Sequence, residues 1–308
     1  MSTLFKQHKE DQKCSVNKKY DGESCFSIDA LCRMAAAWNI ECNNTGEGTP
    51  ITIKEHKGYL IKELTKALSN ICDNQICWLN QEFIKSMNDA EINDHTFLPK
   101  IGQGRFSWLN TTNIVDSMKQ YEIKHEDFKF LGCVPINFNV LPQYEIKNMD
   151  LDLLYVSGIR QLGFIFNLDE HWQSGSHWVS MYANLKKNQI YFFDSGGKRP
   201  VKRIRDLVNR ISTWCYKRNI KKSRSIIKKS EEMIDLDFME STKNPIEKSI
   251  KSIKYNSIVH QKKNSECGVY SINFIRRMLL GETFESITKN PTNDDEMNEC
   301  RKIYFRFE

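Results

Sequence analysis

The hydrophobic pattern of this chain changes near residue 130, and that change constrains the fold more than any other feature. Before it, residues 24–40, behind a Ser or Asp cap, and residues 56–88 place apolar side chains at helical spacing, and a capped helix should begin near Thr112. After it come short apolar and β-branched runs separated by polar turns: FLGCVPINFNVL, LGFIFNL, HWVSMYANL and QIYFFDS. Helices followed by a group of strands predict an α+β protein.

The strand-rich part continues into further helices. KKNQ, between YANL and IYFFDS, is short enough to be a hairpin turn joining two antiparallel strands. Residues 201–216 return to helical spacing, and a last strand is expected around residues 253–260. A final helix should run from about Gly268 to Leu280 and stop at Gly281, a natural C-terminal cap.

Punctuation by Pro99, Gly102 and Gly104 suggests a boundary between two domains. We expect a helical N-terminal arm domain at residues 1–105 and a core at residues 106–308, with a Lys-rich insertion near 217–250. The lysines could contact nucleic acid, but no aromatic residues are interleaved with them and the acidic EEMIDLD follows at once. A solvated helix face or insertion is therefore the preferred interpretation.

Composition and cysteine usage favour a soluble cytosolic protein. Hydrophobic residues make up 40% and charged residues 27% of the 308, which is a globular balance. No apolar run approaches the roughly 18 residues of a membrane span, and the N-terminus has no apolar stretch like that of a secretory signal. The ten cysteines are irregularly spaced, so we expect reduced thiols. Cys72 and Cys77 could be half of a zinc site, but no second pair has finger-like spacing.

The string HQKKNSECGVYSINFIRRMLLG contains the cysteine with the best placement for chemistry. Cys267 precedes a helix with apolar residues spaced to face a core, namely Val269, Ile272, Ile275 and Leu279. A sulfur at the positive end of a helix dipole is stabilised as the thiolate, which is the nucleophilic form. Gly268 is small enough to let a substrate approach. A lone Cys-Gly would indicate only a buried cysteine at a helix start, so further residues must support the assignment.

Gln261 lies six positions before Cys267 and offers one such group. Its side-chain amide can donate a hydrogen bond to a carbonyl oxygen that gains negative charge during acyl transfer. By itself, a glutamine in a loop is usually a solvated residue. Gln261 becomes a candidate site residue because it lies six positions before Cys267.

The segment SGSHWVSMYANLKKNQIYFFDSGG supplies a base and an acid. His177 opens one expected strand and Asp194 closes the next, 17 residues later. Antiparallel strands joined by a tight turn fold back on each other, so both side chains should reach the same sheet edge. His177 could then take the thiol proton, while Asp194 orients the ring and favours its charged form. His171 is the alternative base, but it precedes the turn-like QSGS and is expected to be an exposed loop residue.

These residues in this order resemble the SUMO-specific proteases and the related proteases of ubiquitin-like modifiers. The shared pattern is His-Trp, then Asp-Ser, then Gln with Cys-Gly six residues on. The resemblance implies a papain-like, Ulp1-like cysteine protease core, in which helices flank a central mixed sheet. It also implies four catalytic residues: His177, Asp194, Cys267 and Gln261.

The segment WLN, Trp108 to Asn110, is similar to the one that opens the catalytic domain in SUMO proteases. In that family an aromatic residue of this segment covers the substrate's glycines. The resemblance therefore implies that Trp108 and Trp178 bind substrate in a narrow tunnel that only residues without side chains can thread. Thr111 departs from the acidic residue that usually follows WLN in that family.

A closer resemblance is to the polyprotein-processing cysteine proteases of African swine fever virus and its relatives in giant DNA viruses. It covers the C-D-x-x-x-C pattern at Cys72, the helix TTNIVDSMKQYEIKH, the strand end IVHQ and the tail from ECGVYSINFIRR to IYFRFE. It implies that an extra helical arm precedes the catalytic core. Asp194 departs from the swine fever enzyme, which carries Asn there, and Trp108 is a second departure.

The resemblance implies a cysteine endopeptidase that cuts viral structural polyproteins after Gly-Gly-type motifs during virion maturation, in host cytoplasm and in the virion. No cofactor or metal is implied, and neither a membrane nor nucleic acid is an expected partner. One alternative is an isopeptidase that removes SUMO, ubiquitin or a related modifier. Others are an acetyltransferase effector with a similar His, acid and Cys arrangement, and a catalytically dead binding module, which the presence of all four groups disfavours.

Overall fold

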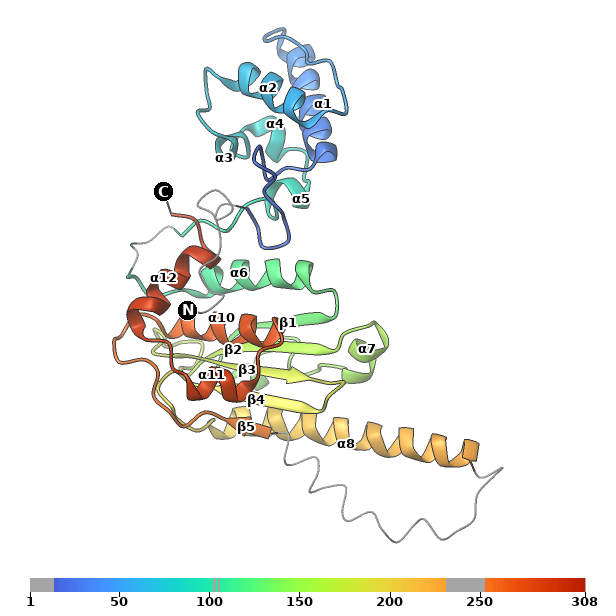
Figure 1. Ribbon diagram of the computed structural model, residues 1–308, viewed down its shortest axis with the longest axis vertical. Coiled ribbons are helices and arrows are strands. Elements are labelled where there is room, and N and C mark those ends of the chain that lie inside the picture. The colour runs from blue at the N-terminus through green and yellow to red at the C-terminus, as the bar shows by residue number, and fades with distance from the viewer. Residues whose placement is uncertain (1–13, 102–103, 105, 231–252, 308) are drawn as a thin grey trace. The chain divides into compact units, whose positions relative to one another are not determined.

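The computed structural model of the chain describes residues 14–101, 104, 106–230 and 253–307 (Figure 1). It divides into two compact units, Met1–Gly102 with Lys302–Glu308, and Gln103–Arg301. The C-terminal residues thus group with the N-terminal unit. There the backbone amide of Arg306 donates to the carbonyl of Pro99 at 3.1 Å, and its Nε donates to the carbonyl of Leu98 at 3.1 Å.

The N-terminal unit is helical, which confirms the prediction for the first hundred residues. Its helices are α1 (Ile28–Thr45), α2 (Lys57–Leu68), α3 (Gln75–Trp78), α4 (Glu82–Lys85) and α5 (Ala90–Asn93). Ser27 caps α1, because its side chain accepts a hydrogen bond from the backbone amide of Ala30. One face of each of the two long helices is buried, and these faces share a core that includes Leu31, Leu60 and Trp78.

The expectation of reduced thiols is wrong for four of the ten cysteines. Cys14 pairs with Cys25, and Cys72 pairs with Cys77, both in the N-terminal unit. Chain folding brings the partners of each pair to Cα separations of 5.3 and 5.4 Å, which suit a disulfide. The C-D-x-x-x-C pattern therefore closes a small loop by a disulfide.

The second unit is built around a five-stranded mixed sheet, as predicted. Its strands are β1 (Phe128–Pro135), β2 (Gln161–Asn167), β3 (Trp178–Asn184), β4 (Gln189–Phe193) and β5 (Ile253–Tyr255), in the order β1-β2-β3-β4-β5. Strands β2, β3 and β4 are antiparallel neighbours, whereas β1 and β5 run parallel to their partners at the two edges. The β3–β4 hairpin forms where KKNQ predicted it, with Asn188 in the left-handed conformation at φ 54°.

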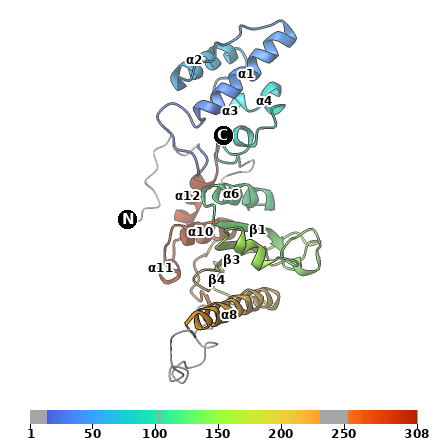
Figure 2. The ribbon, with the colours of Figure 1, turned by 90° about the vertical axis from the view of Figure 1, so that its right-hand side faces the viewer.

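Helices cover both faces of this sheet (Figures 1 and 2). On one face, α8 (Lys202–Ser230) buries Ile204, Leu207 and Ile211 against alternate residues of the strands, such as Phe164 and Met181. On the other face lies α10 (Cys267–Leu279), with α6 (Thr111–Lys124) beside it. Alternate strand residues point to opposite faces, so each strand contributes to both layers.

Helix α10 is buried on nearly all sides. The ring of Phe274 stacks on the ring of Phe193 of β4, with centroids 5.0 Å apart. The four residues predicted to face a core are all buried: Val269, Ile272, Ile275 and Leu279. Gly163 of β2 makes room on this face, because a Cβ there would lie 2.7 Å from the ring of Phe128. The sheet and this helix therefore form one rigid platform.

The rest of the unit contradicts the expectation at the end of the last strand and adds helices that were not predicted. Helix α8 continues to Ser230, so residues 217–230 extend a helix, while residues 231–250 of the expected insertion lie outside the described residues. Strand β5 ends at Tyr255, because the chain turns away to carry residues 256–261 past the end of β4. Three further helices were not predicted from the sequence: α7 (Leu151–Val156) lies between β1 and β2, whereas α11 (Phe284–Lys289) and α12 (Asp294–Tyr304) follow α10. Among the described helices, none has the length and apolar character of a membrane span.

Candidate active site

A base and an acid meet at one end of the β3–β4 hairpin. His177 immediately precedes β3 and Asp194 immediately follows β4, so the antiparallel pairing brings them to the same edge of the sheet. Nε2 of His177 lies 2.7 Å from Oδ1 of Asp194. The structure thus brings together the two residues that the hairpin argument placed at one sheet edge.

Asp194 is a fixed, buried group. Only 1% of it is exposed, and its Oδ1 also accepts a hydrogen bond from the backbone amide of Gly196 at 2.7 Å. The side chain of Asn256, just beyond β5, makes two hydrogen bonds to the backbone of Asp194. Its Oδ1 accepts from the amide at 2.9 Å, and its Nδ2 donates to the carbonyl at 2.7 Å. A buried carboxylate held in this way gives His177 a partner with a defined position.

The surroundings of His177 favour its charged form. Burial lowers its pKa, but the hydrogen bond to Asp194, the charge of that carboxylate and the interaction with Cys267 outweigh burial and raise the pKa to about 9. An imidazole with such a pKa is protonated at neutral pH. It can therefore stabilise a thiolate and later give a proton to a leaving amine.

Cys267 stands at the first position of α10, as the sequence predicted, where free backbone amides give the helix end positive character. The residue is 3% exposed, and its interaction with His177 is one of the causes that raise the pKa of that imidazole. Because Nε2 of His177 faces Asp194, Nδ1 is the ring nitrogen left for the sulfur. Acid, imidazole and thiol therefore form one continuous chain, which is the arrangement that nucleophilic catalysis needs.

A buried ion pair supports the start of this helix. Glu266, the residue before Cys267, accepts hydrogen bonds from Arg301 Nε at 2.9 Å, Asn298 Nδ2 at 3.0 Å and Ser265 Oγ at 2.8 Å. Arg301 is completely buried, and its Nη2 also donates to the carbonyl of Ser265 at 3.2 Å. The positive charge of Arg301 offsets the carboxylate of Glu266, which would otherwise oppose a thiolate one residue away.

Gln261 is anchored beside the acid. Its backbone amide donates to the carbonyl of Ser195 at 3.0 Å, its Oε1 accepts from Ser195 Oγ at 2.7 Å, and its Nε2 donates to the carbonyl of Lys263 at 2.7 Å. These contacts tie Gln261 to the residue that follows Asp194. The side-chain nitrogen keeps a second N–H for another acceptor.

The WLN segment packs against the start of α10. A Cβ at Gly268 would lie 3.0 Å from Cβ of Leu109, so a larger residue there would have to push Leu109 back by a few tenths of an ångström. The sequence argument had given Gly268 the role of admitting substrate. The carbonyl of Leu109 accepts a hydrogen bond from Nε1 of Trp178 at 2.9 Å. Trp178 and helix α10 therefore both contact the WLN segment.

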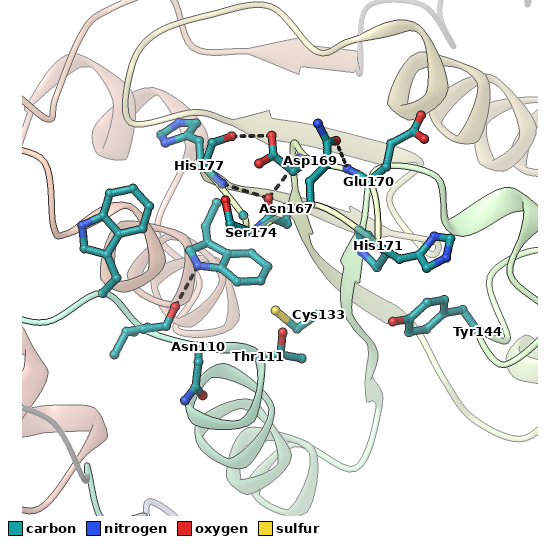
Figure 3. Close-up of a pocket in the computed structure, with 17 residues that line it drawn as sticks. Asn110, Thr111, Cys133, Tyr144, Asn167, Asp169, Glu170, His171, Ser174 and His177 are labelled. Atoms are coloured by element: carbon teal, nitrogen blue, oxygen red, sulfur yellow. Dashed lines mark hydrogen bonds between the residues drawn. The ribbon is translucent and has the colours of Figure 1, made fainter.

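A cavity of about 430 Å³ opens beside His177, and both Trp108 and Trp178 line it (Figure 3). Trp178 is buried, whereas 42% of Trp108 is exposed. Cys133, and not Cys267, is the cysteine among the residues that line this cavity. Burial raises the pKa of Cys133 well above its usual value, so this thiol stays protonated and is no rival nucleophile.

His171 lines the same cavity but has different partners. Its Nδ1 lies 2.7 Å from Nδ2 of Asn137, and its ring meets Trp172 edge to face with centroids 4.7 Å apart. Its backbone amide donates to Asn137 Oδ1 at 3.1 Å. The structure therefore gives it no link to Asp194 and places it in the exposed loop after β2.

Sequence reasoning missed the groups that hold the site together. Ser195 could have been noticed as part of Asp-Ser, but its partner Gln261 lies 66 residues away. Nothing in the sequence marked Asn256. Glu266 and Arg301 resembled ordinary surface charges, and their partnership spans 35 residues.

Comparison with known proteins gives a consistent picture. The model of the Ulp1 protease family, C-terminal catalytic domain, matches residues 164–306. A protein of Acanthamoeba polyphaga mimivirus that is named as a thiol protease is 34% identical over 305 residues. The match covers 94% of this chain and 92% of that protein. The SUMO-1 cysteine protease of African swine fever virus is 22% identical over 275 residues, covering 80% of this chain and 88% of that one.

The fold is likewise similar to a solved structure. The crystal structure of the African swine fever virus protease matches with a TM-score of 0.60 and 17% sequence identity, over 96% of both chains. At this level of identity, the match concerns the fold.

Proposed function

Since the chain belongs to the Ulp1 family of cysteine proteases and has viral proteases as relatives, we propose that it cuts viral structural polyproteins after Gly-Gly-type motifs during virion maturation. We assign catalysis to Cys267, His177, Asp194 and Gln261, and substrate binding to Trp108 and Trp178. The observation that carries this proposal is His177, which is hydrogen-bonded to Asp194 at 2.7 Å and whose pKa is raised by both Asp194 and Cys267.

The geometry leads to a two-step acyl transfer. The thiolate of Cys267 attacks the peptide carbonyl, forming a C–S bond and an oxyanion that the amide of Gln261 and the Cys267 backbone N–H stabilise. As the intermediate collapses, the C–N bond breaks and His177 gives its proton to the amine. Water then attacks the thioester with His177 as base, releasing the acid and restoring the thiolate.

The confined approach to the sulfur supports the proposed selectivity for glycine. Cys267 is almost wholly buried, Leu109 packs on the residue after it, and Trp178 is fixed to Leu109. A substrate side chain next to the scissile carbonyl would have to displace these groups, whereas glycine has none. Trp108, Leu109 and Trp178 also line the cavity beside His177, which supports binding of an extended Gly-Gly segment there.

The test is hydrolysis of a peptide containing Gly-Gly-X, with matched peptides containing Ala-Gly-X and Gly-Val-X. Wild type should cleave the first peptide much faster, and Cys267→Ala should abolish cleavage. Cys215→Ala removes a buried thiol on α8, on the far face of the sheet, and should leave the rate unchanged. Equal rates on all three peptides would contradict the glycine selectivity.

The polyprotein role needs a natural substrate. Co-expression with capsid precursors of the same virus should yield fragments that begin directly after Gly-Gly, with host cytoplasm and particles as the expected locations. SUMO and ubiquitin carrying a C-terminal electrophile provide the contrasting probe. If they label Cys267 efficiently while the precursors stay intact, the chain is a deconjugating enzyme instead.

A further inference from the structure

The buried Ser195, next to the catalytic acid, holds Gln261 at two points. Its hydroxyl donates to Oε1 of Gln261 at 2.7 Å, and its carbonyl accepts from the backbone amide of Gln261 at 3.0 Å. Ser195 is 1% exposed, so water does not compete freely for these contacts. Both the main chain and the side chain of Gln261 therefore depend on this one residue.

These contacts fix which way the amide of Gln261 faces. Nε2 donates to the carbonyl of Lys263, and a carbonyl can only accept, so the nitrogen must lie on that side and Oε1 must face Ser195. In this orientation one N–H remains for an oxyanion. If the amide turned over, its oxygen would repel the oxyanion instead.

The segment that carries Ser195 is itself clamped. Asn256 is 2% exposed and pairs with both the amide and the carbonyl of Asp194, in the manner of a backbone neighbour in a sheet. The carbonyl of Ser195 also accepts from the amide of His260 at 2.8 Å. The strand end after β4 and the chain segment 256–261 are therefore held in a fixed relation, with the acid on one and Gln261 on the other.

We propose that Ser195 is a positioning residue for the reaction, which couples the acid to the oxyanion donor by holding Oε1 and the backbone amide of Gln261 in place, while the carbonyl of Lys263 orients the amide nitrogen. This inference rests on the proposed function, because it takes Gln261 to contact the tetrahedral intermediate. The hydroxyl acts through Gln261 and has no bond-making step of its own.

A double-mutant cycle on the full chain tests the coupling. Gln261→Ala should lower kcat by about 10²- to 10³-fold, as loss of an oxyanion donor does. Ser195→Ala should lower kcat about 2- to 10-fold, the range for one hydrogen bond, with little change in KM. In the Gln261→Ala background, Ser195→Ala should add nothing, because the group that it directs is gone.

Two further variants distinguish loss of the positioning of Gln261 from loss of folding. Ser195→Thr keeps the hydroxyl and should retain most of kcat, whereas Ser195→Cys is close in size but a weak donor and should lose it. Ser180→Ala is the matched control, since Ser180 is a fully buried β3 serine whose hydroxyl has no hydrogen-bond partner. Its kcat should equal that of wild type. Alkylation of Cys267 by iodoacetamide should proceed at the wild-type rate in Ser195→Ala, because His177 and Asp194 are untouched.

The outcomes distinguish this inference from the proposed function. If Ser195→Ala and Ser195→Cys keep wild-type kcat while Gln261→Ala loses a hundredfold, the positioning role is refuted and the protease assignment stands. Losses that multiply in the double variant also refute it, since they would be independent. If neither Cys267→Ala nor Gln261→Ala slows hydrolysis, the proposed function itself fails.

Discussion

Replacing Asp194 by Asn tests the electrostatics of the centre, because it keeps the size of the side chain and removes its charge. In the wild type, the pKa of His177 is raised to about 9, with Asp194 as one of the two partners that raise it. An opposite charge in contact typically shifts a pKa by about one to three units, so Asp194→Asn should bring that of His177 to about 6–8.

The consequence depends on pH in a calculable way. At pH 8, a pKa of about 9 leaves about 90% of the imidazole protonated, whereas a pKa of about 7 leaves about 10%. At pH 6, both enzymes would carry about 90% or more of the charged form. The loss of kcat/KM in Asp194→Asn from this cause should therefore be small at pH 6 and about tenfold at pH 8.

The assay is kcat/KM for a Gly-Gly peptide between pH 5 and 10. The alkaline limb should fall near pH 9 in wild type, and about two units lower in Asp194→Asn. Asp127→Asn removes a charge at the opposite end of β2, where the carboxylate accepts from Gln161 Nε2 at 3.0 Å, and should leave the limb in place. An alkaline limb at the same pH in wild type and Asp194→Asn would refute the reasoning.

Four further outcomes follow from the described contacts. Because the pKa of His177 is raised, its charged form stabilises the folded chain below about pH 6.5, and this contribution should disappear from pH-dependent unfolding as pH rises through about 9. Arg301→Met should lower the free energy of unfolding by about 3–5 kcal/mol, since Glu266 is left buried and unpaired; Lys202→Met, which breaks an exposed pair with Asp206, should cost at most about 1 kcal/mol in the same denaturant titration. Thiol titration of denatured, unreduced protein should count six of the ten cysteines, and a count of ten would contradict both disulfides. Trp178→Phe loses the hydrogen bond to Leu109 and should raise KM about 2- to 10-fold in peptide kinetics, while an unchanged KM would argue against Trp178 as a wall of the substrate channel.

The sequence predicted the parts of the fold whose signals are local. Strands β1 to β4 and helix α10 follow from hydrophobic runs and spacing, and the pairing of His177 with Asp194 follows from one tight hairpin. The approach of Cys267 to His177 joins segments far apart in the chain. Only resemblance to a known family predicted it, because no periodicity specifies which distant segments pack together.

Long-range polar contacts could not be predicted. The partners in the Asn256 clamp on Asp194 are 62 residues apart, and a lone asparagine after a strand has many common uses. The disulfide pairs could not be predicted for a related reason, because irregular cysteine spacing does not define which cysteines pair. The end of β5 was misplaced because residues 256–261 are apolar and β-branched enough for a strand but bond instead to the turn after β4.

The near-complete burial of Cys267 has a consequence for inhibitor chemistry. A compound aimed at this sulfur must carry its electrophilic carbon at the tip of a slender, unbranched stem, because Leu109 and Trp178 are bound to each other and cannot easily part. Warheads flanked by bulky aromatic or branched groups, which suit open-cleft thiol enzymes, should react poorly.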